Sequence, residues 1–396
     1  MPPIDGGRLV AWTTLQALVE AGVEITLVAP VPPGEDTGAI EGELAAVCHP
    51  RLVRAAPQGR VPALLRSVLG GRAFAVVRHA LPAVAREVER LVATERFDAV
   101  HAEQVHAFAQ AEPALRAGLP VVLRAQNVES DLWRAAASLR HLLPPGAGPW
   151  LAREARRLAR YEGWAVRRAA ATIALSEQDA ERLRELAGPS IRGRAHVVTI
   201  PPPFPADLPP ADHELPGDPP LVLLGSGGWL PNRDGTRWFL EVIWPEVHAR
   251  LPGAVLHLYA AKSERPKRLP EGVHPHPPPT DSRDAFAPNA ILVVPLRIAS
   301  GIRMKILEAW ARGVPVVATP EAAAGLGAED GRELLLARNG GGFASSVEQL
   351  DSPGELQRRV AGAGRRALET RHRRGECALE LTRLYAGEPA HVRDPR

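Results

Sequence analysis

The sequence is poor in cysteine and in aromatic residues, and both shortages limit what the protein can be. Cys48 and Cys377 are the only cysteines in 396 residues, so neither a disulfide framework nor a cysteine-rich metal site is expected, and a reduced, cytoplasmic setting fits. Aromatic residues make up 5% of the chain without any visible array of stacking rings, which argues against nucleic-acid binding. No apolar run is long enough to span a bilayer, and the amino-terminal residues do not form a signal peptide.

Motifs that hold a metal ion are also missing. The sequence contains no Asp-x-Asp motif and no cluster of histidines, so no metal cofactor is expected. Arginine, by contrast, is abundant: the net charge is only +3, but the sequence pI is about 9.2. A basic surface directed toward an anionic lipid or an anionic substrate would account for this excess.

Length and proline distribution predict two domains. A chain of 396 residues exceeds the usual size of one hydrophobic core, and 45% hydrophobic residues suffice for two cores. The proline-rich segment 201–220 cannot form a helix or a central strand, so we expect a semi-rigid linker there. We therefore expect a first domain over residues 1–200 and a second over residues 221–372.

The most informative stretch is Ile291–Thr319, ILVVPLRIASGIRMKILEAWARGVPVVAT. Its continuous apolar run, Ile291–Leu296, predicts a strand that is buried on both faces of a parallel sheet. Ser300 is the predicted N-cap of a helix that opens at Gly301 and ends near Arg312, before a second buried strand. Because ligands bind outside the carboxyl ends of such strands, the loop before this helix should line a site.

The predicted helix carries charges that packing does not require. Arg303 and Lys305 lie in or near its first turn, where the helix dipole disfavours cations, and an anion bound there would explain them. Glu308 would return to the same face as Gly301 roughly 10 Å along the axis, a distance that suits the diphosphate and ribose of a nucleotide. Alternatively, the two cations extend to water and Glu308 is a solvated helix residue. The spacing alone leaves both interpretations open.

The stretch P-L-R-I-A-S-G-I-R-M-K-I-L-E-A, followed by G-V-P-V-V-A-T, resembles the donor-binding motif of retaining glycosyltransferases with the GT-B fold. It is similar to the family 4 type, in the branch of bacterial polysaccharide sugar transferases. The resemblance implies an α/β protein with two Rossmann-like domains that face a cleft, the nucleotide-sugar donor on the second and the acceptor mainly on the first. It also implies that a terminal helix, residues 373–396, crosses back onto the first domain.

Within this resemblance, Glu308 corresponds to the acid that holds the ribose of the nucleotide sugar. Many members carry a Glu-x7-Glu pair whose first acid would fall at Ser300; this chain has Ser-Gly there, as one branch of the family does. The departure concerns the contact with the sugar hydroxyl and leaves the nucleotide site intact.

Glycine-containing loops resemble further parts of the family's donor site. The loop GSGGWLPNRD, residues 225–234, is similar to the family's Gly-Ser-x-x-Trp-x-Pro-Asn-x-Asp loop, and the segment PEAAAGLG after Thr319 resembles the loop near the base and ribose. Gly6-Gly7 resembles a loop near the donor phosphates or the acceptor, although an ordinary helix start explains two glycines as well. The donor-binding residues that the resemblance implies are Gly6, Gly7, Gly227, Gly228, Asn232, Arg233, Ser300, Gly301, Ile302, Glu308 and Thr319.

The segment A-Q-N-V-E-S, residues 125–130, resembles a His-Asn-x-Glu motif of the family, whose histidine lies near the transferred sugar. Gln126 replaces this histidine; it can hydrogen-bond a hydroxyl but cannot carry a proton at neutral pH. Asn127 and Glu129 match the motif, although Glu129 could equally be an acid at a helix start. The candidate catalytic residues are Gln126, Arg303, Lys305 and Glu308.

Arginines punctuate the apolar residues of two helices predicted at Val61–Leu69 and Ala80–Thr94 in the first domain. This pattern suits a surface that docks on a membrane, which would place the protein at the inner face of the plasma membrane. A solvated helix face explains the pattern equally well. The arginines are Arg60, Arg66, Arg72, Arg78, Arg86 and Arg90.

The chain starts in the loop before its first predicted helix, where relatives enter from an apolar strand. That strand is central in a sheet of order 3-2-1-4-5, so its absence would leave Val23–Ala29 and Phe97–Ala102 with unpaired backbone groups. Each buried unpaired group costs on the order of 1–3 kcal/mol, against a net domain stability of ~5–15 kcal/mol. We therefore expect a missing first strand, an unstable first domain and a true start upstream of Met1.

The resemblance implies transfer of a sugar, typically a hexose, from a nucleotide-sugar donor to a hydroxyl of a sugar or lipid-linked acceptor in polysaccharide or glycolipid synthesis. It further implies front-side attack with retention, in which the donor's phosphate receives the acceptor proton. Two alternatives remain: a nucleotide-sugar epimerase with the same fold, and a non-catalytic protein that binds a nucleotide sugar.

Overall fold

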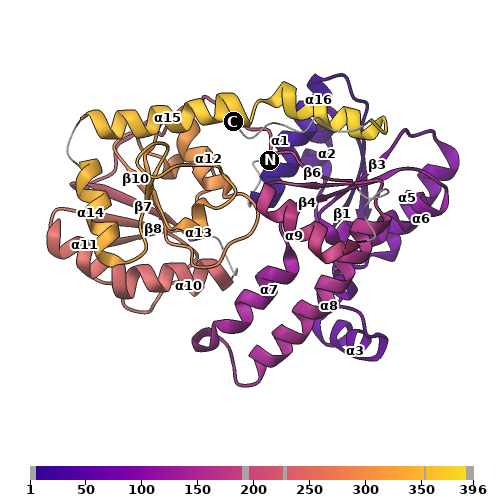
Figure 1. Ribbon diagram of the computed structural model, residues 1–396, viewed down its shortest axis with the longest axis horizontal. Helices are drawn as coiled ribbons and strands as arrows, with labels where there is room; N and C mark the ends of the chain where they lie inside the picture. The colour runs from indigo at the N-terminus through magenta and orange to yellow at the C-terminus, as the bar shows by residue number, and fades with distance from the viewer. Residues whose placement is uncertain (1–5, 190–195, 226–229, 352–353, 389–396) are drawn as a thin grey trace.

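The computed structural model describes residues 6–189, 196–225, 230–351 and 354–388. Two Rossmann-like α/β domains lie side by side, and the last two helices run along one edge of both (Figure 1). All strand pairs between named strands are parallel, as expected for strands that alternate with helices.

The second domain is built on one continuous sheet with the order β12-β11-β10-β7-β8-β9. Read from β9, this is the 3-2-1-4-5-6 order of a doubly wound fold, whose ligand site lies between β7 and β10. The predicted strand at Ile291–Leu296 is confirmed as β10, which is buried and paired on both sides. The strands are β7 (Pro220–Leu224), β8 (Val255–Tyr259), β9 (Val273–His276), β10 (Ile291–Val294), β11 (Val316–Ala318) and β12 (Leu335–Leu336).

Helices cover both faces of this sheet. On one face α11 packs with α14, and on the other α12 packs with α15. The period of two along β7 explains the layers, since Leu221 and Leu223 belong to one apolar cluster and Val222 to the other. The helices are α10 (Leu230–Trp238), α11 (Trp244–Arg250), α12 (Met304–Ala311), α13 (Pro320–Ala323), α14 (Gly340–Asp351) and α15 (Glu355–Arg371), with a π-helical segment at Phe239–Ile243 and 3-10 turns at Lys262–Glu264 and Ser282–Ala285.

The sheet of the first domain is divided into two pieces. One piece pairs β1 with β2, and the other has the order β3-β4-β5-β6; among the described residues no strand joins β1 to β3. The sequence predicts unpaired edges on the strands at Val23–Ala29 and Phe97–Ala102, the positions of β1 and β3. The residues flanking the gap on β1 and β3 are mostly half-buried, so the free edges are not sealed inside a core. The strands are β1 (Thr26–Val31), β2 (His49–Arg54), β3 (Val100–Glu103), β4 (Val121–Ala125), β5 (Ala171–Ala174) and β6 (His196–Thr199).

The helices of the first domain include a long hairpin, α7 and α8, that projects below the sheet with α3 beside it (Figure 1). Ser176 and Asp179 have the spacing of a capping box at the start of α9, and the Ser176 hydroxyl accepts a hydrogen bond from the Asp179 N–H. The helices are α1 (Gly6–Glu20), α2 (Gly38–Ala45), α3 (Arg60–Gly70), α4 (Phe74–His79), α5 (Pro82–Thr94), α6 (Glu112–Arg116), α7 (Glu129–Ser138), α8 (Ala147–Arg168) and α9 (Glu177–Ala187), with 3-10 segments at Val105–Ala111 and Arg140–Leu142.

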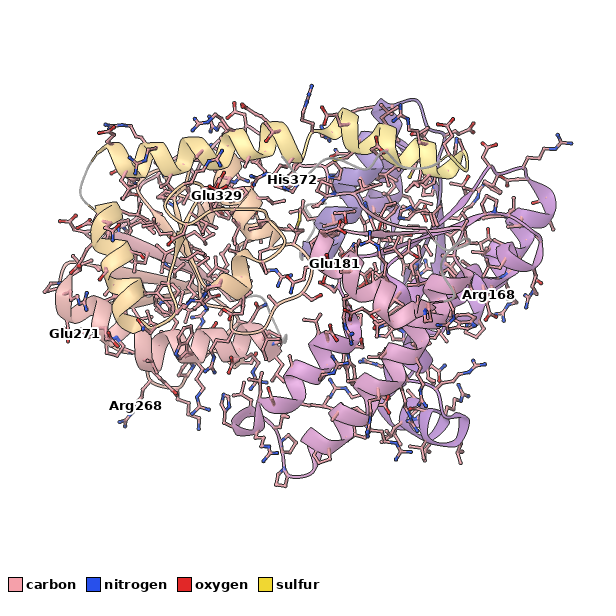
Figure 2. The ribbon with its side chains drawn as sticks, viewed as in Figure 1. Arg168, Glu181, Arg268, Glu271, Glu329 and His372 are labelled. Carbon is pink, nitrogen blue, oxygen red and sulfur yellow. The ribbon has the colours of Figure 1, made fainter. Side chains whose placement is uncertain are left out.

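The chain crosses between the domains twice, in the linker 201–220 and between α15 and the last helix, and hydrogen bonds join the two crossings. The last helix, α16 (Arg374–Tyr385), lies on the first domain and packs on α1. At the second crossing, His372 is buried; its carbonyl accepts from the Phe204 N–H at 3.0 Å, and its ring Nδ1 lies 2.8 Å from the Pro202 carbonyl (Figure 2). In the part of the chain that the structure describes, no helix combines the length and the apolar character needed to cross a membrane.

Candidate active site in the cleft

The helix that carries the candidate donor site begins later than the sequence predicts. Gly301 has φ +71°, a left-handed conformation that a helix cannot contain, and α12 begins at Met304 with Arg303 as its N-cap residue. Ser300 therefore does not cap this helix. The two-turn helical relation between Gly301 and Glu308 is wrong for the same reason.

The turn before α12 instead makes hydrogen bonds to the first domain. The Ser300 hydroxyl accepts from the Val128 N–H at 2.8 Å and donates to Asp179 Oδ1 at 3.0 Å. The Gly301 N–H donates to Asp179 Oδ2 at 2.9 Å. Asp179 thus does more than close its own capping box, since it joins the two domains at the floor of the cleft.

The closeness of this contact explains the glycine at position 301. A Cβ atom there would lie 2.2 Å from the Gln126 carbonyl oxygen and 2.5 Å from Asn127 Oδ1. Ile302, next in the chain, is buried in an apolar cluster that includes Val10 and Leu175 of the first domain. The same floor contains Gly6 at the start of α1, whose added Cβ would lie 3.4 Å from Met304 Cγ.

Arg303 and Lys305 are half-buried cations at the amino end of α12. Lys305 Nζ donates to the carbonyl of Leu224, at the carboxyl end of β7, at 2.8 Å, and Arg303 donates to the Ser300 carbonyl. Among the described residues neither cation forms an ion pair with a carboxylate. Burial lowers the pKa of Arg303 to about 10, although the nearby Asp179 carboxylate acts in the opposite direction. Burial together with the Arg303 charge lowers the pKa of Lys305 to about 8.

Two cations in this setting attract an anion. They share the first turn of a helix, where free N–H groups and the dipole already favour negative charge. They also lie at the switch point between β7 and β10, where this type of sheet binds its ligands. The arrangement therefore favours the anion-binding interpretation over extension into water.

Helix α10 supplies part of the same edge. Asn232 is buried in α10 and lines a small cavity together with Leu224 and Lys305, whereas Arg233 is exposed on the same helix. Gly227 and Gly228 lie outside the described residues. The sequence did not single out Asp234, which is buried and pairs with Arg297 at 2.5 Å and, across the cleft, with His141 Nε2 at 3.1 Å.

Glu308 is buried rather than solvated. Its Oε1 accepts from Arg312 Nη2 at 2.8 Å and from the Ser282 hydroxyl at 2.5 Å. Thr319 is also engaged: its hydroxyl caps α13 through the Ala322 N–H at 3.2 Å and donates to the Leu296 carbonyl. Lys305 and Glu308 therefore have different hydrogen-bond partners within the second domain.

The Gln126 side chain is hydrogen-bonded to three other residues of the first domain. Its Nε2 donates to the Gly7 carbonyl at 3.0 Å and to Glu103 Oε1 at 2.7 Å, and its Oε1 accepts from Gln104 Nε2 at 3.2 Å. Both amide hydrogens are therefore in use. This residue positions the start of α1 against the end of β3, and the sequence could not distinguish that role from contact with a sugar.

Charged residues at the ends of β3 and β4 form an ionic network next to Gln126. Arg124 is 2% exposed and binds Glu103 at 2.5 Å and the Thr14 hydroxyl at 2.6 Å. Although burial alone would raise the pKa of Glu103, the Arg124 charge and the hydrogen bond from His101 hold that pKa well below its ordinary range. His101 Nδ1 lies 2.8 Å from the Tyr385 hydroxyl, so the network reaches the last helix.

Gln104 stands out by its backbone. Its φ of +70° and ψ of 152° lie in a region that side chains rarely adopt, and among the described residues it is the one non-glycine with positive φ. Such strain persists where the surroundings impose it and is common at functional sites. Gln104 follows β3 at the carboxyl edge, beside Gln126, so we add it to the candidate acceptor side. Its spacing in the sequence gave no sign of this.

Glu129 opens α7 at the edge of the cleft, half-buried. Burial raises the pKa of Glu129 to about 7, so this carboxyl can exchange a proton near neutral pH, which Gln126 cannot do. Glu162 lies behind it and accepts from the N–H groups of Glu129 and Ser130 at 2.7 and 3.2 Å. Burial and the nearby Glu129 carboxylate raise the pKa of Glu162 as well, to about 8, although those two N–H groups favour its charged form.

The described residues contain no group of three or more His, Cys, Asp or Glu arranged to hold a metal ion. The polar groups of the cleft include Arg303 and Lys305, which form no ion pair among the described residues, the paired carboxylates of Glu308 and Asp234, the hydrogen-bonded network of the first domain and Glu129. Such a set can bind an anionic leaving group and orient hydroxyls.

Two Rossmann-like domains that meet in this way form the GT-B fold of glycosyltransferases. The sequence matches the model of "Glycosyl transferases group 1" over residues 220–352 and that of "Glycosyl transferase 4-like domain" over residues 5–203. The chain belongs to this family of glycosyltransferases. No curated protein matches it.

Solved structures share the fold over nearly the whole chain. A sucrose-phosphate synthase from Thermosynechococcus elongatus has a TM-score of 0.69 at 17% identity, covering 96% of this chain and 93% of its own. Anabaena HepE in complex with UDP and glucose has a TM-score of 0.64 at 16% identity, covering 97% and 96%. A glycosyltransferase from Rickettsia africae has a TM-score of 0.63 at 11% identity, covering 96% and 94%.

Proposed function

We propose that this glycosyltransferase moves a hexosyl group from a nucleoside diphosphate sugar to a hydroxyl of a sugar or lipid-linked acceptor, with retention, in polysaccharide or glycolipid synthesis. The observation that carries the proposal is the pair of half-buried cations, Arg303 and Lys305, without carboxylate partners among the described residues. Anabaena HepE, which has a similar fold, was solved with UDP and with UDP-glucose, which supports a nucleotide-sugar donor.

The protein's part in this reaction is electrostatic. The bond between sugar C1 and the diphosphate oxygen breaks while a bond forms between C1 and the acceptor oxygen, and the departing diphosphate takes the acceptor proton. Arg303 and Lys305 are placed to stabilise the negative charge that develops on that diphosphate. We propose that these cations carry out the task without a metal ion, and that Glu308 binds the ribose diol.

We further propose that the acceptor occupies the first domain, near Gln104 and Glu129, and that Arg-rich helices of this domain hold the enzyme at the inner face of the plasma membrane. Glu129 is the group there whose pKa, raised by burial to about 7, allows proton exchange.

The hydrogen bonds of Ser300 and Gln126 also support an alternative, a protein that binds a nucleotide sugar without catalysis. Ser300 and Gln126, which replace residues used by many active relatives, are both engaged in internal hydrogen bonds. A protein that binds a nucleotide sugar without turnover would tolerate this. Release of nucleoside diphosphate from UDP-glucose, GDP-mannose and other donors decides between the two, because a binding protein releases none.

The anion site is tested by the change Lys305→Met. We expect the dissociation constant for the preferred nucleoside diphosphate, among UDP, GDP, ADP and dTDP, to rise about 30-fold in calorimetry, because a charge-assisted hydrogen bond contributes ~2 kcal/mol. The melting temperature of the free protein should not fall, since the change removes a desolvated charge.

Lys267→Met is the matched control, because Lys267 is exposed on the same domain. It should leave the affinity unchanged. If Lys305→Met binds all four diphosphates as tightly as this control does, the diphosphate does not lie at the amino end of α12.

A further inference from the structure

Helix α3 exposes its large apolar side chains. Among the described residues, five of the seven exposed large hydrophobic residues lie on this single helix of 11 residues. Leu69 is 86% exposed and Leu65 is 59% exposed. Scattered exposed leucines are ordinary on a protein surface, but a contiguous group marks an interaction site. The five are Val61, Leu64, Leu65, Val68 and Leu69.

The opposite face of α3 is fixed to the domain, so this exposure is a property of the packed helix. Ala63 and Ser67 are fully buried. The Ser67 hydroxyl donates to the Arg72 carbonyl at 2.8 Å and accepts from Arg157 Nη1 at 3.2 Å. Arg157 is buried and paired with Glu154 at 2.7 Å. The helix thus turns its small residues inward and its large apolar residues outward.

The other Arg-rich helix of the first domain, α5, has the usual orientation. Val84 and Leu91 are buried in α5, and its exposed face mixes arginines with Glu87 and Glu89. Its apolar stripe is therefore already used by the core. Of the two Arg-rich helices that the sequence predicts, α3 alone keeps an apolar face for a partner.

The charge around α3 has a single sign. Residues 44–86 contain no Asp or Glu but seven arginines. Arg60, Arg66 and Arg72 are exposed at the two ends and along the side of α3. Helix α8 lies beside α3 at the same end of the molecule (Figure 1), and its Arg153 and Arg156 are exposed. An apolar stripe flanked by arginines matches a partner that is apolar inside and anionic at its surface.

We propose that α3 is an interfacial helix that lies in the surface of an anionic lipid bilayer, with its five large apolar side chains at the acyl boundary and its arginines at the lipid phosphates. A second copy of the chain fits less well, because a two-fold contact would bring these acid-free, Arg-rich faces together. This inference names the surface and the lipid for the membrane contact proposed above. It requires no turnover, so it can fail or hold independently of the transferase reaction.

Co-sedimentation with vesicles tests the proposal. At 0.1 M NaCl the full chain should bind vesicles of phosphatidylcholine with 30% phosphatidylglycerol, and it should bind vesicles of phosphatidylcholine alone at least ~10-fold more weakly. The double variant Leu65→Glu/Leu69→Glu should lose at least ~10-fold in binding to the anionic vesicles. Arg66→Gln/Arg72→Gln should weaken binding and reduce its dependence on salt.

Val242→Glu/Leu379→Glu is the matched control, since these residues are 45% and 51% exposed on other helices. It should bind like the unchanged chain. Equal loss in this control, or equal binding of the unchanged chain to both kinds of vesicle, overturns the proposal. So does a dimer in light scattering that Leu65→Glu/Leu69→Glu converts to a monomer, because α3 would then contact a second copy. All variants should keep the circular-dichroism melting curve and the nucleoside diphosphate affinity of the unchanged chain.

Discussion

The first and second domains, which form the two walls of the cleft, differ in whether their buried charged side chains form ion pairs. On the first domain, Arg124 and Glu103 neutralise each other, and amide side chains hold the ends of the strands in place. On the second domain, Arg303 and Lys305 have backbone carbonyls as partners, and burial lowers the pKa of both. The Arg124–Glu103 pair on the first domain is therefore neutral without a ligand, whereas Arg303 and Lys305 on the second domain keep their positive charge.

This difference separates two kinds of recognition. A cation without an ion-pair partner contributes to binding by meeting an anion, so it suits the diphosphate of a donor. A neutralised network offers oriented hydrogen-bonding groups, which suit the hydroxyls of an acceptor. The contrast can be tested by changing single residues on each wall.

Glu308 on the second wall should give the largest effect. Glu308→Gln leaves Arg312 without its carboxylate, and breaking a buried pair costs about 3 kcal/mol of unfolding free energy. If Glu308 also holds the ribose, nucleoside diphosphate affinity should fall at least ~10-fold. Glu241→Gln is the control, because the Arg237–Glu241 pair has the same i,i+4 spacing but is exposed, where such pairs contribute at most ~0.5 kcal/mol.

The double variant Glu308→Gln/Arg312→Met separates the two roles of Glu308. It should recover much of the unfolding free energy, because no unpaired guanidinium remains, yet the affinity should stay low. Recovery of affinity together with stability would show that Glu308 acts only through the fold of its domain.

The lowered pKa of Lys305 predicts that nucleoside diphosphate binding depends on pH above about pH 8. Its pKa, lowered to about 8 by burial, should rise toward its ordinary value when a diphosphate binds. The dissociation constant should therefore be constant below pH 8 and increase up to ~10-fold per unit above it. Calorimetry between pH 7 and 9.5 measures this, with Lys305→Met as the reference. A flat profile in the unchanged chain would mean that Lys305 does not meet the anion.

Gln104 should give the smallest effect, on the first wall. Gln104→Gly relieves a backbone conformation that costs ~1–3 kcal/mol, so the melting temperature should rise; Gln104→Ala keeps the strain and should not raise it. Both changes should lower kcat/KM for the acceptor a few-fold and leave diphosphate affinity unaltered. A Gln104→Gly variant that is more stable and fully active would remove this residue from the acceptor site.

Local patterns in the sequence predicted the strands and helices well. The apolar run of β10 and the helices α3 and α5 are confirmed within a few residues, because each depends on neighbours in the chain. The start of α12 was wrong because Gly301 meets Asp179, which is 122 residues away in the sequence. The second strand, β2, was missed because its sequence, HPRLVR, mixes polar with apolar residues without a regular alternation and none of them is buried.

The candidate site was only partly predictable for the same reason. Arg303, Lys305 and Glu308 could be named from their spacing, but their partners come from β7, from the turn before α12 and from the 3-10 turn at Ser282. The strain at Gln104 depends on backbone angles that composition does not reveal. Whether α3 turns its apolar face inward or outward likewise depends on Ser67 and Arg157, which no periodicity connects.

The position of α16 has a consequence for synthesis on the ribosome. The apolar cluster between α1 and β5 of the first domain includes Cys377 and Leu381 of α16, so this part of the domain cannot finish packing until the last helix has emerged. The cluster around Trp244 and Phe343, by contrast, draws only on the second domain and can form earlier in folding. Although domains usually fold in the order in which they are made, the half translated first is here the half completed last.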